Sequence, residues 1–288
     1  MDTKELAVHT GDNHRFIDEA GDMTFFSSKR GSKTSLIGDP GVSRCFMVGM
    51  VHVKGDLAEA RSAIKVFCEM VDTNEFFQSF PSVASRTEKG WQGYYPHASK
   101  DPAELRYEFL KLMKEKIDFS AQIVVGRKLP DVFLRKHQRL QREFYADLMS
   151  HLLKYTHKID PLILDIAERG SSTSNMNLQH AVDVARERSR RGTLTKEMNN
   201  KVKFNVQPYD HELLLSLTDY CLWSAQRVFE KGDTKYYKLL ESKIKLVHDV
   251  YDQSRYEKSK NYYRTKYNPL TAEAIGFADW RKPEWPEP

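Results

Sequence analysis

The sequence is poor in cysteine and has no long apolar run. Its 288 residues include three cysteines that lie far apart, Cys45, Cys68 and Cys221. An odd number at these spacings fits neither a zinc-binding pattern nor a disulfide framework, and it is typical of a reducing compartment. No apolar run approaches the ~20 residues that span a bilayer, and residues 1–14 lack the apolar stretch of a signal peptide. We therefore expect a cytoplasmic protein with no membrane partner.

The composition is that of a folded globular protein with a small excess of positive charge. Hydrophobic residues make up 40% and aromatic residues 11% of the chain, which is enough for a sizeable core and excludes global disorder. The net charge of +5, from 45 basic and 40 acidic residues, favours a polyanionic partner without deciding it. Neither a repeat nor a linker divides the sequence. We expect a single domain over 1–288, with a core at 13–250 and a C-terminal extension at 251–288.

Apolar patterning predicts an α/β protein, because short apolar runs indicate strands and spacings of three and four indicate helices. Strands are expected at 15–18, 45–53, 121–125, 161–166 and 202–206, with another at 23–28 that pairs back on the first as a hairpin. Helices are expected at 56–71, 130–157, 176–191, 211–231 and 235–249, and in a segment with Asp101 as its N-cap. This order predicts a mixed sheet of about five strands flanked by helices. The long helix at 130–157 is expected to be an insertion packed on the sheet.

The stretch HRFIDEAGD at 14–22 is the first candidate for a functional site. We interpret Asp18 as standing where a central strand leaves its sheet, and Gly21 as the turn residue that follows. Side chains alternate along a strand, so Glu19 would lie on the opposite side from Asp18. A carboxylate held at such a point is suited to binding a divalent cation. The alternative is an acidic hairpin turn, since Asp and Gly are ordinary turn residues.

Two further acids lie in comparable positions. Asp165 ends the strand predicted at 161–166, and Asp219 lies in the middle of an apolar helix. Burying a lone carboxylate costs on the order of several kcal/mol unless it is paired, hydrogen-bonded or bound to a metal. We therefore expect Asp219 to face a cleft. The alternative is a partly exposed acid that pairs with Arg227 or Lys231.

Convergence of Asp18, Asp165 and Asp219 would bring together three negative charges that a cation must neutralise. All-oxygen ligands favour Mg²⁺ or Mn²⁺ over zinc, and we expect one or two such ions. The reaction that this kind of site performs best is phosphodiester hydrolysis, for which two ions lie about 4 Å apart.

Several segments of the chain resemble one known family. They are FIDEAGD, PHASKDPAELRYEF, LILDIAERGSS, LTDYCLWSAQRVFEKGD and NYYRTKYNPL, in this order between His14 and Leu270. Their number and order resemble the domain-of-unknown-function family 3800, a branch of the ribonuclease H-like fold. The resemblance implies a ribonuclease H-like mixed sheet over most of the chain.

The resemblance also implies the residues of the site. The family's acids fall on Asp18 with Glu19 beside it, on Asp165 and on Asp219. The chain has LTDY where LADY is expected, and the acid is kept. Fold and acids together predict a metal-dependent nuclease that acts on RNA or DNA. Its catalytic residues would be these four acids, and the three aspartates would bind the metal.

Other polar residues are expected to support this site. They are His97 and Asp101 in the middle motif, Glu168 just beyond the late strand, His211 at the start of the apolar helix, and Glu230 on the same face of that helix as Asp219. For either histidine an ordinary structural position is an equal alternative.

Two clusters of arginine could bind the phosphates of a nucleic acid. One comprises Arg186, Arg188, Arg190 and Arg191 at a helix C-terminus, and the other includes Arg135 and Arg139. The alternative for either cluster is a solvated helix face or a complement to the helix dipole.

Two rival functions stay open at this point. One is a nucleic-acid- or protein-binding subunit that keeps the fold but has lost catalysis, within an antiviral, defence-type complex or as a homodimer. The other is a metal-dependent phosphotransfer or phosphatase enzyme acting on a small substrate. Salt-sensitive binding without metal-stimulated cleavage would favour the first, and turnover of nucleotides but not of polymers would favour the second.

Overall fold

The computed structural model describes residues 11–27, 34–154, 156–169, 173–191 and 198–276. Within these ranges the chain forms a seven-stranded sheet in the order β5-β4-β1-β2-β3-β6-β7. The strands are β1 His14–Ala20, β2 Cys45–Val53, β3 Phe119–Arg127, β4 Leu162–Ala167, β5 Val202–Gln207, β6 Ile244–Asp249 and β7 Tyr262–Tyr263. β1 pairs antiparallel with β2 and parallel with β4, so the sheet is mixed, as expected.

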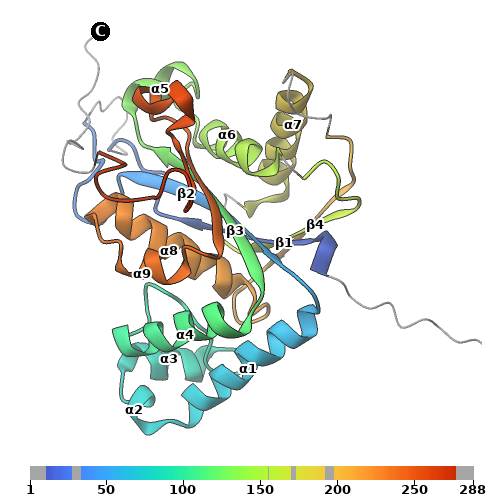
Figure 1. Cartoon of the computed structure of the whole chain (residues 1–288), viewed down its shortest axis with the longest axis vertical. Coiled ribbons are helices and arrows are strands. Elements are labelled where there is room, and N and C mark those ends of the chain that lie inside the picture. Colours follow the sequence, from blue (N-terminus) through green and yellow to red (C-terminus); the bar gives the residue numbers. More distant parts are fainter. Residues whose placement is uncertain (1–10, 28–33, 155, 170–172, 192–197, 277–288) are drawn as a thin grey trace, which may run out of the picture.

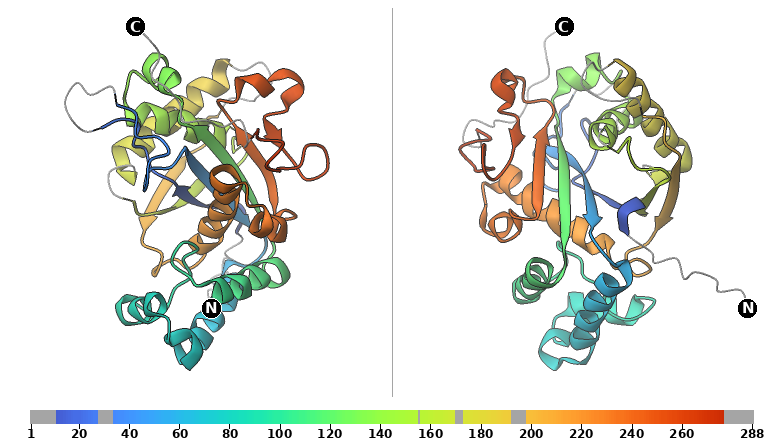
Figure 2. Two further views of the ribbon diagram at one scale, coloured as in Figure 1. Left: turned by 90° about the vertical axis from the view of Figure 1, so that its left-hand side faces the viewer. Right: turned by 45° about the vertical axis from the view of Figure 1, so that its right-hand side comes forward.

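Helices cover both faces of the sheet (Figures 1 and 2). One face carries α8 Leu215–Lys231 and α9 Lys235–Leu240, and the other carries α5 Pro130–Arg135, α6 Gln141–Leu153 and α7 Asn175–Arg191. A helical lobe below the sheet in Figure 1 consists of α1 Leu57–Thr73, α2 Glu75–Gln78, α3 Pro81–Lys89 and α4 Ala103–Lys116. None of the helices in the described ranges is long and apolar enough to cross a membrane.

The alternation of side chains along β1 separates two hydrophobic clusters. Phe16 belongs to the cluster that joins the sheet to α8 and the helical lobe, whereas Ile17 belongs to the cluster under α6 and α7. Side chains two residues apart on a strand share a face. Asp18 therefore lies on the α8 face of the sheet, and Glu19 lies on the α6 face.

Two glycines let helices approach the central strands closely. A Cβ atom on Gly49 of β2 would lie 2.8 Å from Leu222 Cγ of α8. A Cβ atom on Gly126 of β3 would lie 2.8 Å from a methyl carbon of Leu148 in α6. Such separations are far below van der Waals contact, so only glycine permits these two helix positions. Gly49 in particular fixes where α8 lies, and α8 carries Asp219.

The hairpin predicted at 23–28 is wrong. Among the residues of that stretch that the structure describes, Phe26 forms an isolated bridge to Ser35, and β1 pairs instead with β2. The Asp22 carboxylate accepts a hydrogen bond from the buried Lys128 Nζ at 3.0 Å. This long-range contact turns the chain away from β1, and a local pattern cannot reveal it.

The single long helix predicted at 130–157 is also wrong, because the structure divides it into α5 and α6. Gln138 and Arg139 between them have φ angles of 52° and 62°, in the left-handed region. A right-handed helix cannot continue through such residues. The buried His137 contacts Asp147 Oδ2 of α6 at 3.3 Å, which holds this connection in place.

The helix predicted at 235–249 ends early. α9 stops at Leu240, and after a three-residue turn Ile244–Asp249 form β6, which pairs parallel with β3. A short apolar run fits a strand as well as a helix, and pairing with β3 decides the outcome. The C-terminal extension adds β7 to the edge of the sheet beside β6. Residues 277–288 of the extension lie outside the described residues.

Candidate functional site

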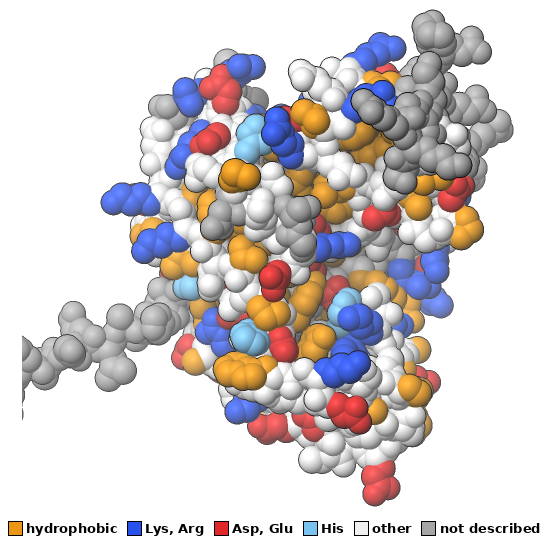
Figure 3. All heavy atoms as spheres, turned by 180° about the vertical axis from the view of Figure 1, so that it is seen from behind, with side chains coloured by type: hydrophobic (Ala, Val, Ile, Leu, Met, Phe, Trp, Pro, Cys, Tyr) orange, Lys and Arg blue, Asp and Glu red, His pale blue; other side chains and the backbone are white. Residues whose placement is uncertain are grey.

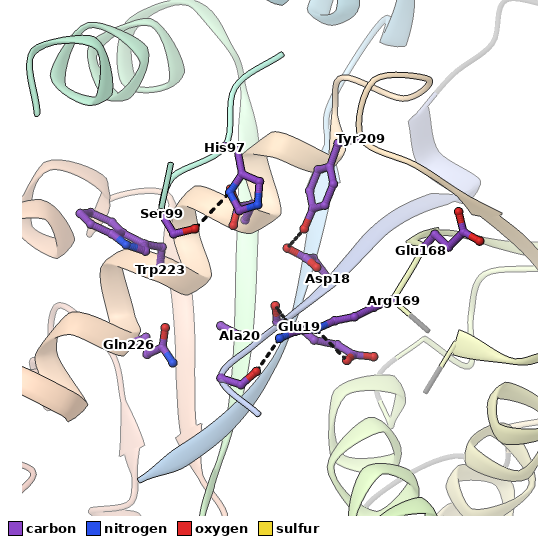
Figure 4. Close-up of a pocket in the computed structure, with 12 residues that line it drawn as sticks. Asp18, Glu19, Ala20, His97, Ser99, Glu168, Arg169, Tyr209, Trp223 and Gln226 are labelled. Atoms are coloured by element: carbon purple, nitrogen blue, oxygen red, sulfur yellow. Dashed lines mark hydrogen bonds and ion pairs between the residues drawn. The ribbon is translucent and has the colours of Figure 1, made fainter. Parts of the chain in front are cut away.

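A cavity of about 370 Å³ opens at the carboxyl end of β1. Acidic side chains from three separate parts of the chain line it, namely Asp18 and Glu19, Glu168, and Asp219. Figure 4 shows Tyr209, His97 and Trp223 in a row along one side, with Asp18 pointing toward Tyr209 and Glu19 lying beside Arg169. The cavity therefore combines carboxylates with an aromatic wall.

Asp18 is buried, with 2% of its surface exposed, on the α8 face of β1. Its Oδ2 accepts a hydrogen bond from Tyr209 Oη at 2.6 Å. Burial and the nearby charge of Asp219 raise the pKa of Asp18 to about 8, although the Tyr209 hydrogen bond acts in the opposite direction. Asp18 is thus a carboxyl group whose negative charge its protein surroundings do not compensate.

Asp219 reaches the same cavity from the middle of α8. Its Oδ2 accepts a hydrogen bond from the backbone N–H of Ala98 at 2.7 Å and lies 3.4 Å from His97 Nδ1. The Arg227 guanidinium, one of the cations with which it could have paired, binds Asp233 at 2.6 Å instead. The expectation that Asp219 faces a cleft agrees with this geometry.

Asp101 does not cap a helix, since the N-cap position before α4 is Pro102. Its carboxylate accepts hydrogen bonds from the Arg86 guanidinium, from Tyr94 Oη at 2.8 Å and from Tyr220 Oη. It also accepts one from the backbone N–H of His97 at 3.0 Å. Because Tyr220 follows Asp219 on α8, Asp101 ties the segment that presents His97 and Ala98 to the helix that presents Asp219.

The structure does not bring Asp165 into the cavity with Asp18 and Asp219. Asp165 pairs in register with Phe16, so it lies on the same sheet face as Asp18 but two residues further from the strand end. Its carboxylate is hydrogen-bonded to His14 Nδ1 at 2.7 Å and to Asn205 Nδ2 at 2.7 Å. Strand register between β1 and β4 decides this placement, and a single sequence does not reveal register.

The other predicted supporting residues divide between the cavity and elsewhere. Glu168 follows β4 and lines the cavity, in the region where Asp165 was expected. Glu230 accepts hydrogen bonds from the backbone N–H groups of Arg44 at 2.8 Å and of Cys45 at 3.0 Å, so it anchors the start of β2. His211 is not among the described residues that line the cavity, and its ring lies against that of Trp91, with centroids 4.5 Å apart.

Glu19 lies on the opposite face of β1 from Asp18, as the alternation predicts. It is 5% exposed, and its Oε2 is 4.0 Å from Arg169 Nε. Burial, followed by the charge of Glu19, raises the pKa of the α6 phenol Tyr145 well above its ordinary value. Glu19 therefore reaches the cavity from the side of α6.

The two arginine clusters do not border the cavity. In the first, Arg188 binds the buried Asp147 and Arg191 Nε binds Glu187 at 2.7 Å. Within α7, Arg186 forms an ion pair with Asp183 at 3.4 Å, and Arg190 forms one with Glu187 at 3.5 Å. In the second cluster, Arg135 lies 3.9 Å from Asp131, and the Arg139 guanidinium lies 6.0 Å from the Phe26 ring. None of these six side chains is among the described residues that line the cavity. The alternatives to phosphate binding were a solvated helix face or a complement to the helix dipole, and phosphate binding by either cluster stays a prediction.

Two residues of the cavity wall were missed by sequence reasoning. Tyr209 lies in the loop after β5 and hydrogen-bonds Asp18, and Arg169 donates from its guanidinium to the backbone carbonyl of Glu19 at 2.7 Å. Both stand two residues beyond the end of a strand, β5 for Tyr209 and β4 for Arg169, and the carboxyl ends of parallel strands meet at one edge. Their position just after a strand was the feature of the sequence that could have identified them.

Within the described residues, no group of three or more His, Cys, Asp or Glu side chains is arranged to hold a metal ion by itself. The cavity instead offers the carboxylates of Asp18 and Asp219 together, with Glu168 on its rim. No family model matches the chain, and no curated protein has a matching sequence.

Proposed function

We propose that this chain is a metal-dependent nuclease that hydrolyses phosphodiester bonds in RNA or DNA. The observation that carries the proposal is the convergence of Asp18 from β1 and Asp219 from α8 in one cavity, where burial and mutual repulsion raise the pKa of Asp18 to about 8. Two buried carboxylates that repel each other destabilise the folded state. Such pairs are therefore typical of functional sites. Binding a cation is the purpose that fits an all-oxygen donor set.

The residues present fit Mg²⁺ or Mn²⁺. Asp18 and Asp219 would hold the ion, and Glu168 lines the same cavity. Mg²⁺ in phosphate chemistry is usually bound through one or two carboxylates while the substrate phosphate and water supply the remaining oxygens. A cavity with two buried carboxylates that is open to solvent matches this mode of Mg²⁺ binding better than a closed site with three protein ligands would. When bound, the ion would stabilise the negative charge that develops on the phosphate.

The chain's own groups position these carboxylates. The Tyr209 hydroxyl donates to Asp18 at 2.6 Å, and the Ala98 N–H donates to Asp219 at 2.7 Å. Each contact leaves the second carboxylate oxygen for another partner. Arg169 donates to the backbone carbonyls of Glu19 and Gly21, which holds the end of β1 at the cavity mouth.

The fold supports the same proposal. A mixed sheet in which β1 lies between an antiparallel and a parallel neighbour is consistent with the ribonuclease H-like arrangement that the resemblance implies. We extend the proposal to a cytoplasmic location, since the three free cysteines are all buried thiols.

The test is hydrolysis of labelled RNA and DNA with Mn²⁺, by the wild type and by Asp18→Asn and Asp219→Asn. Asn keeps the shape but removes a charged ligand, so each variant should lose at least about 100-fold in rate, because charge stabilisation by a bound ion is worth several kcal/mol. Asp233→Asn is a matched control, since it removes a carboxylate that pairs with Arg227 on the same helix. Cleavage that survives both cavity substitutions would refute the proposal.

One observation favours a second candidate function. Asp165, which the resemblance assigns to the metal, is hydrogen-bonded to His14 and Asn205 outside the cavity. A cavity with an incomplete set of acids suits a nucleic-acid- or protein-binding subunit without catalysis, within a defence-type complex. Binding of nucleic acid by the wild type with no hydrolysis in Mg²⁺ or Mn²⁺ would support this candidate.

A further inference from the structure

An exposed tryptophan contacts the loop that contains the cavity residue Tyr209. Trp91, in the loop between α3 and α4, has 65% of its surface exposed. Its ring lies against His211, with centroids 4.5 Å apart and planes inclined by 35°. The backbone N–H of Trp91 donates to Asp210 Oδ2 at 3.0 Å, which holds this loop against the loop after β5. The indole is therefore held in place at the backbone and on one side, while most of its surface faces solvent.

The Trp91–His211 pair is joined to the cavity through a short stretch of chain. Tyr209, which lines the cavity, is two residues before His211, and two residues span at most about 7 Å. The Tyr209 ring stacks on His97 inside the cavity, with centroids 5.5 Å apart. Figure 4 shows Tyr209, His97 and Trp223 along one side of the cavity. One aromatic pair is thus exposed and the other lies in the cavity, and residues 209–211 join the two along the chain.

A fixed and exposed indole has a specific use. Large aromatic side chains are usually buried, since each removes a large apolar area from water. An aromatic face left open beside a site can stack on a nucleobase, and such stacking contributes to binding whatever the base, because every base has a π-face. The fixed backbone of Trp91 reduces the entropy that binding would otherwise cost.

The charges around the pair are of both signs, since the exposed Glu88 precedes Lys89 and the Asp210 carboxylate accepts from the backbone of Trp91. Lys89 and Lys100 are exposed at the two ends of the segment that carries Trp91. Glu212, next to His211, is neutralised by Arg61, whose Nη2 lies 2.6 Å from Glu212 Oε2. Figure 3, a view from behind, shows a hollow above the helical lobe with histidine, basic, acidic and hydrophobic side chains around it.

We propose that the Trp91–His211 pair is a stacking platform for a nucleobase, and that the chain therefore takes single-stranded nucleic acid. This inference rests on the proposed nuclease function and adds its substrate class. A base stacked on Trp91 belongs to a nucleotide close to the one whose phosphate enters the cavity. In a duplex the neighbouring bases cover both faces of each base, so a stacking platform selects unpaired strands.

The test is binding of a labelled oligonucleotide of about 12 nucleotides, a length within the range of single-strand sites, followed by fluorescence anisotropy. Ca²⁺ replaces Mn²⁺ so that binding is measured without cleavage, and a second series is measured in EDTA. Trp91→Ala should weaken single-strand binding at least about fivefold, and Trp91→Phe should retain most of it. Phe76→Ala is the matched control, since Phe76 is 57% exposed in the same helical lobe and does not line the cavity.

Three results would overturn the inference: equal weakening by Trp91→Ala and Phe76→Ala, equal binding of single strands and duplex by the wild type, or no binding of single strands. If Trp91 instead docks a protein, Trp91→Ala leaves oligonucleotide binding unchanged, which is also a refutation. Failure of the nuclease proposal is seen separately, as absence of Mn²⁺-dependent cleavage or its survival in Asp18→Asn and Asp219→Asn.

Discussion

Two buried aspartates on opposite faces of the sheet are held in contrasting ways. Asp147 of α6 is 5% exposed and lies among partners: Arg188, Lys136 Nζ at 2.7 Å and Tyr251 Oη at 2.5 Å. Burial alone would raise its pKa, but hydrogen bonds from His137 and Lys136 and the Lys136 charge hold the pKa of Asp147 well below its usual range. Asp18 is equally buried, yet burial and Asp219 raise its pKa to about 8.

On the proposed function, the contrast separates a structural carboxylate, Asp147, from a metal-binding one, Asp18. A buried carboxylate with complementary partners stabilises the folded state only while every partner is present, because removing one leaves an uncompensated buried charge. A buried acid beside a second acid costs stability, and such an arrangement is typical of catalytic and binding sites. We therefore expect substitutions at Asp147 and at Asp18 to change folding stability in opposite directions.

The largest effect on stability is expected at Asp147. Asp147→Ala leaves Arg188 and Lys136 without their buried partner, so the free energy of unfolding should fall by about 3–5 kcal/mol. Urea unfolding followed by circular dichroism measures it. A decrease in the free energy of unfolding below about 1 kcal/mol would show that the network around Asp147 contributes little to stability. Asp147 would then not serve as the structural carboxylate in the comparison with Asp18.

Gly49 and Gly126, which let α8 and α6 approach the sheet, allow the two faces of the sheet to be tested separately. Gly49→Ala forces α8 away from β2, and Gly126→Ala forces α6 away from β3, each at about 1–3 kcal/mol. Both should lower the unfolding midpoint, but Gly49→Ala should also weaken Mn²⁺ binding because α8 carries Asp219. Equal Mn²⁺ affinity in the two variants would contradict the claim that the position of α8 defines the site.

The pH dependence of stability should differ between the two acids. The folded pKa of Asp18 lies above its unfolded value, so its contribution favours folding at low pH and is lost as pH rises from about 4 to about 8. The folded pKa of Asp147 is depressed, so its contribution is present above the unfolded pKa of about 4 and is lost as pH falls below it.

Unfolding in EDTA between pH 5 and 9 isolates the first contribution. Relative to Asp18→Asn, the wild type should lose stability with a slope of up to about 1.4 kcal/mol per pH unit, the limit for one proton. Asp233→Asn serves as the control and should keep the wild-type slope. Parallel curves for the wild type and Asp18→Asn would show that Asp18 has an ordinary pKa.

The smallest stability effect is expected from Asp18→Asn at pH 8. Removing the repulsion with Asp219 should stabilise the metal-free protein by about 1 kcal/mol, as often happens when a functional group is removed from a strained site. Thermal unfolding in EDTA measures the change. A lower melting temperature for this variant would indicate that Asp18 is a structural carboxylate like Asp147.

Sequence patterns predicted the parts of this molecule that local chemistry determines. The runs that form β2, β3 and β4 are apolar enough to be recognised alone, and Asp219 was expected in a cleft because its helix is otherwise apolar. The positions that failed depend on distant partners. The left-handed Arg139 interrupts a helix that its neighbours would continue, and β6 is a strand because β3 lies beside it.

The same reasoning applies to the candidate site. Asp18 was identified from the stretch around it, whereas the position of Asp165 depends on its register against Phe16. Tyr209 and Trp91 lie in loops without periodicity, so the place of Tyr209 in the cavity wall and the contact of Trp91 with His211 follow only from the fold. Chemistry that is confined to one strand or helix can be predicted from sequence, and chemistry assembled between loops requires the structure.

The most direct test of the central claim is Mn²⁺ binding measured by titration calorimetry at pH 8, on the wild type, Asp18→Asn, Asp219→Asn and Asp233→Asn. A cation held by Asp18 and Asp219 predicts specific binding by the wild type and by Asp233→Asn, and loss of that binding in both cavity variants. Since protons compete for Asp18, the wild-type affinity should also weaken as the pH is lowered to 6. Wild-type affinity in Asp18→Asn and Asp219→Asn, or no binding by the folded wild type even with a phosphodiester oligonucleotide present, would contradict the account.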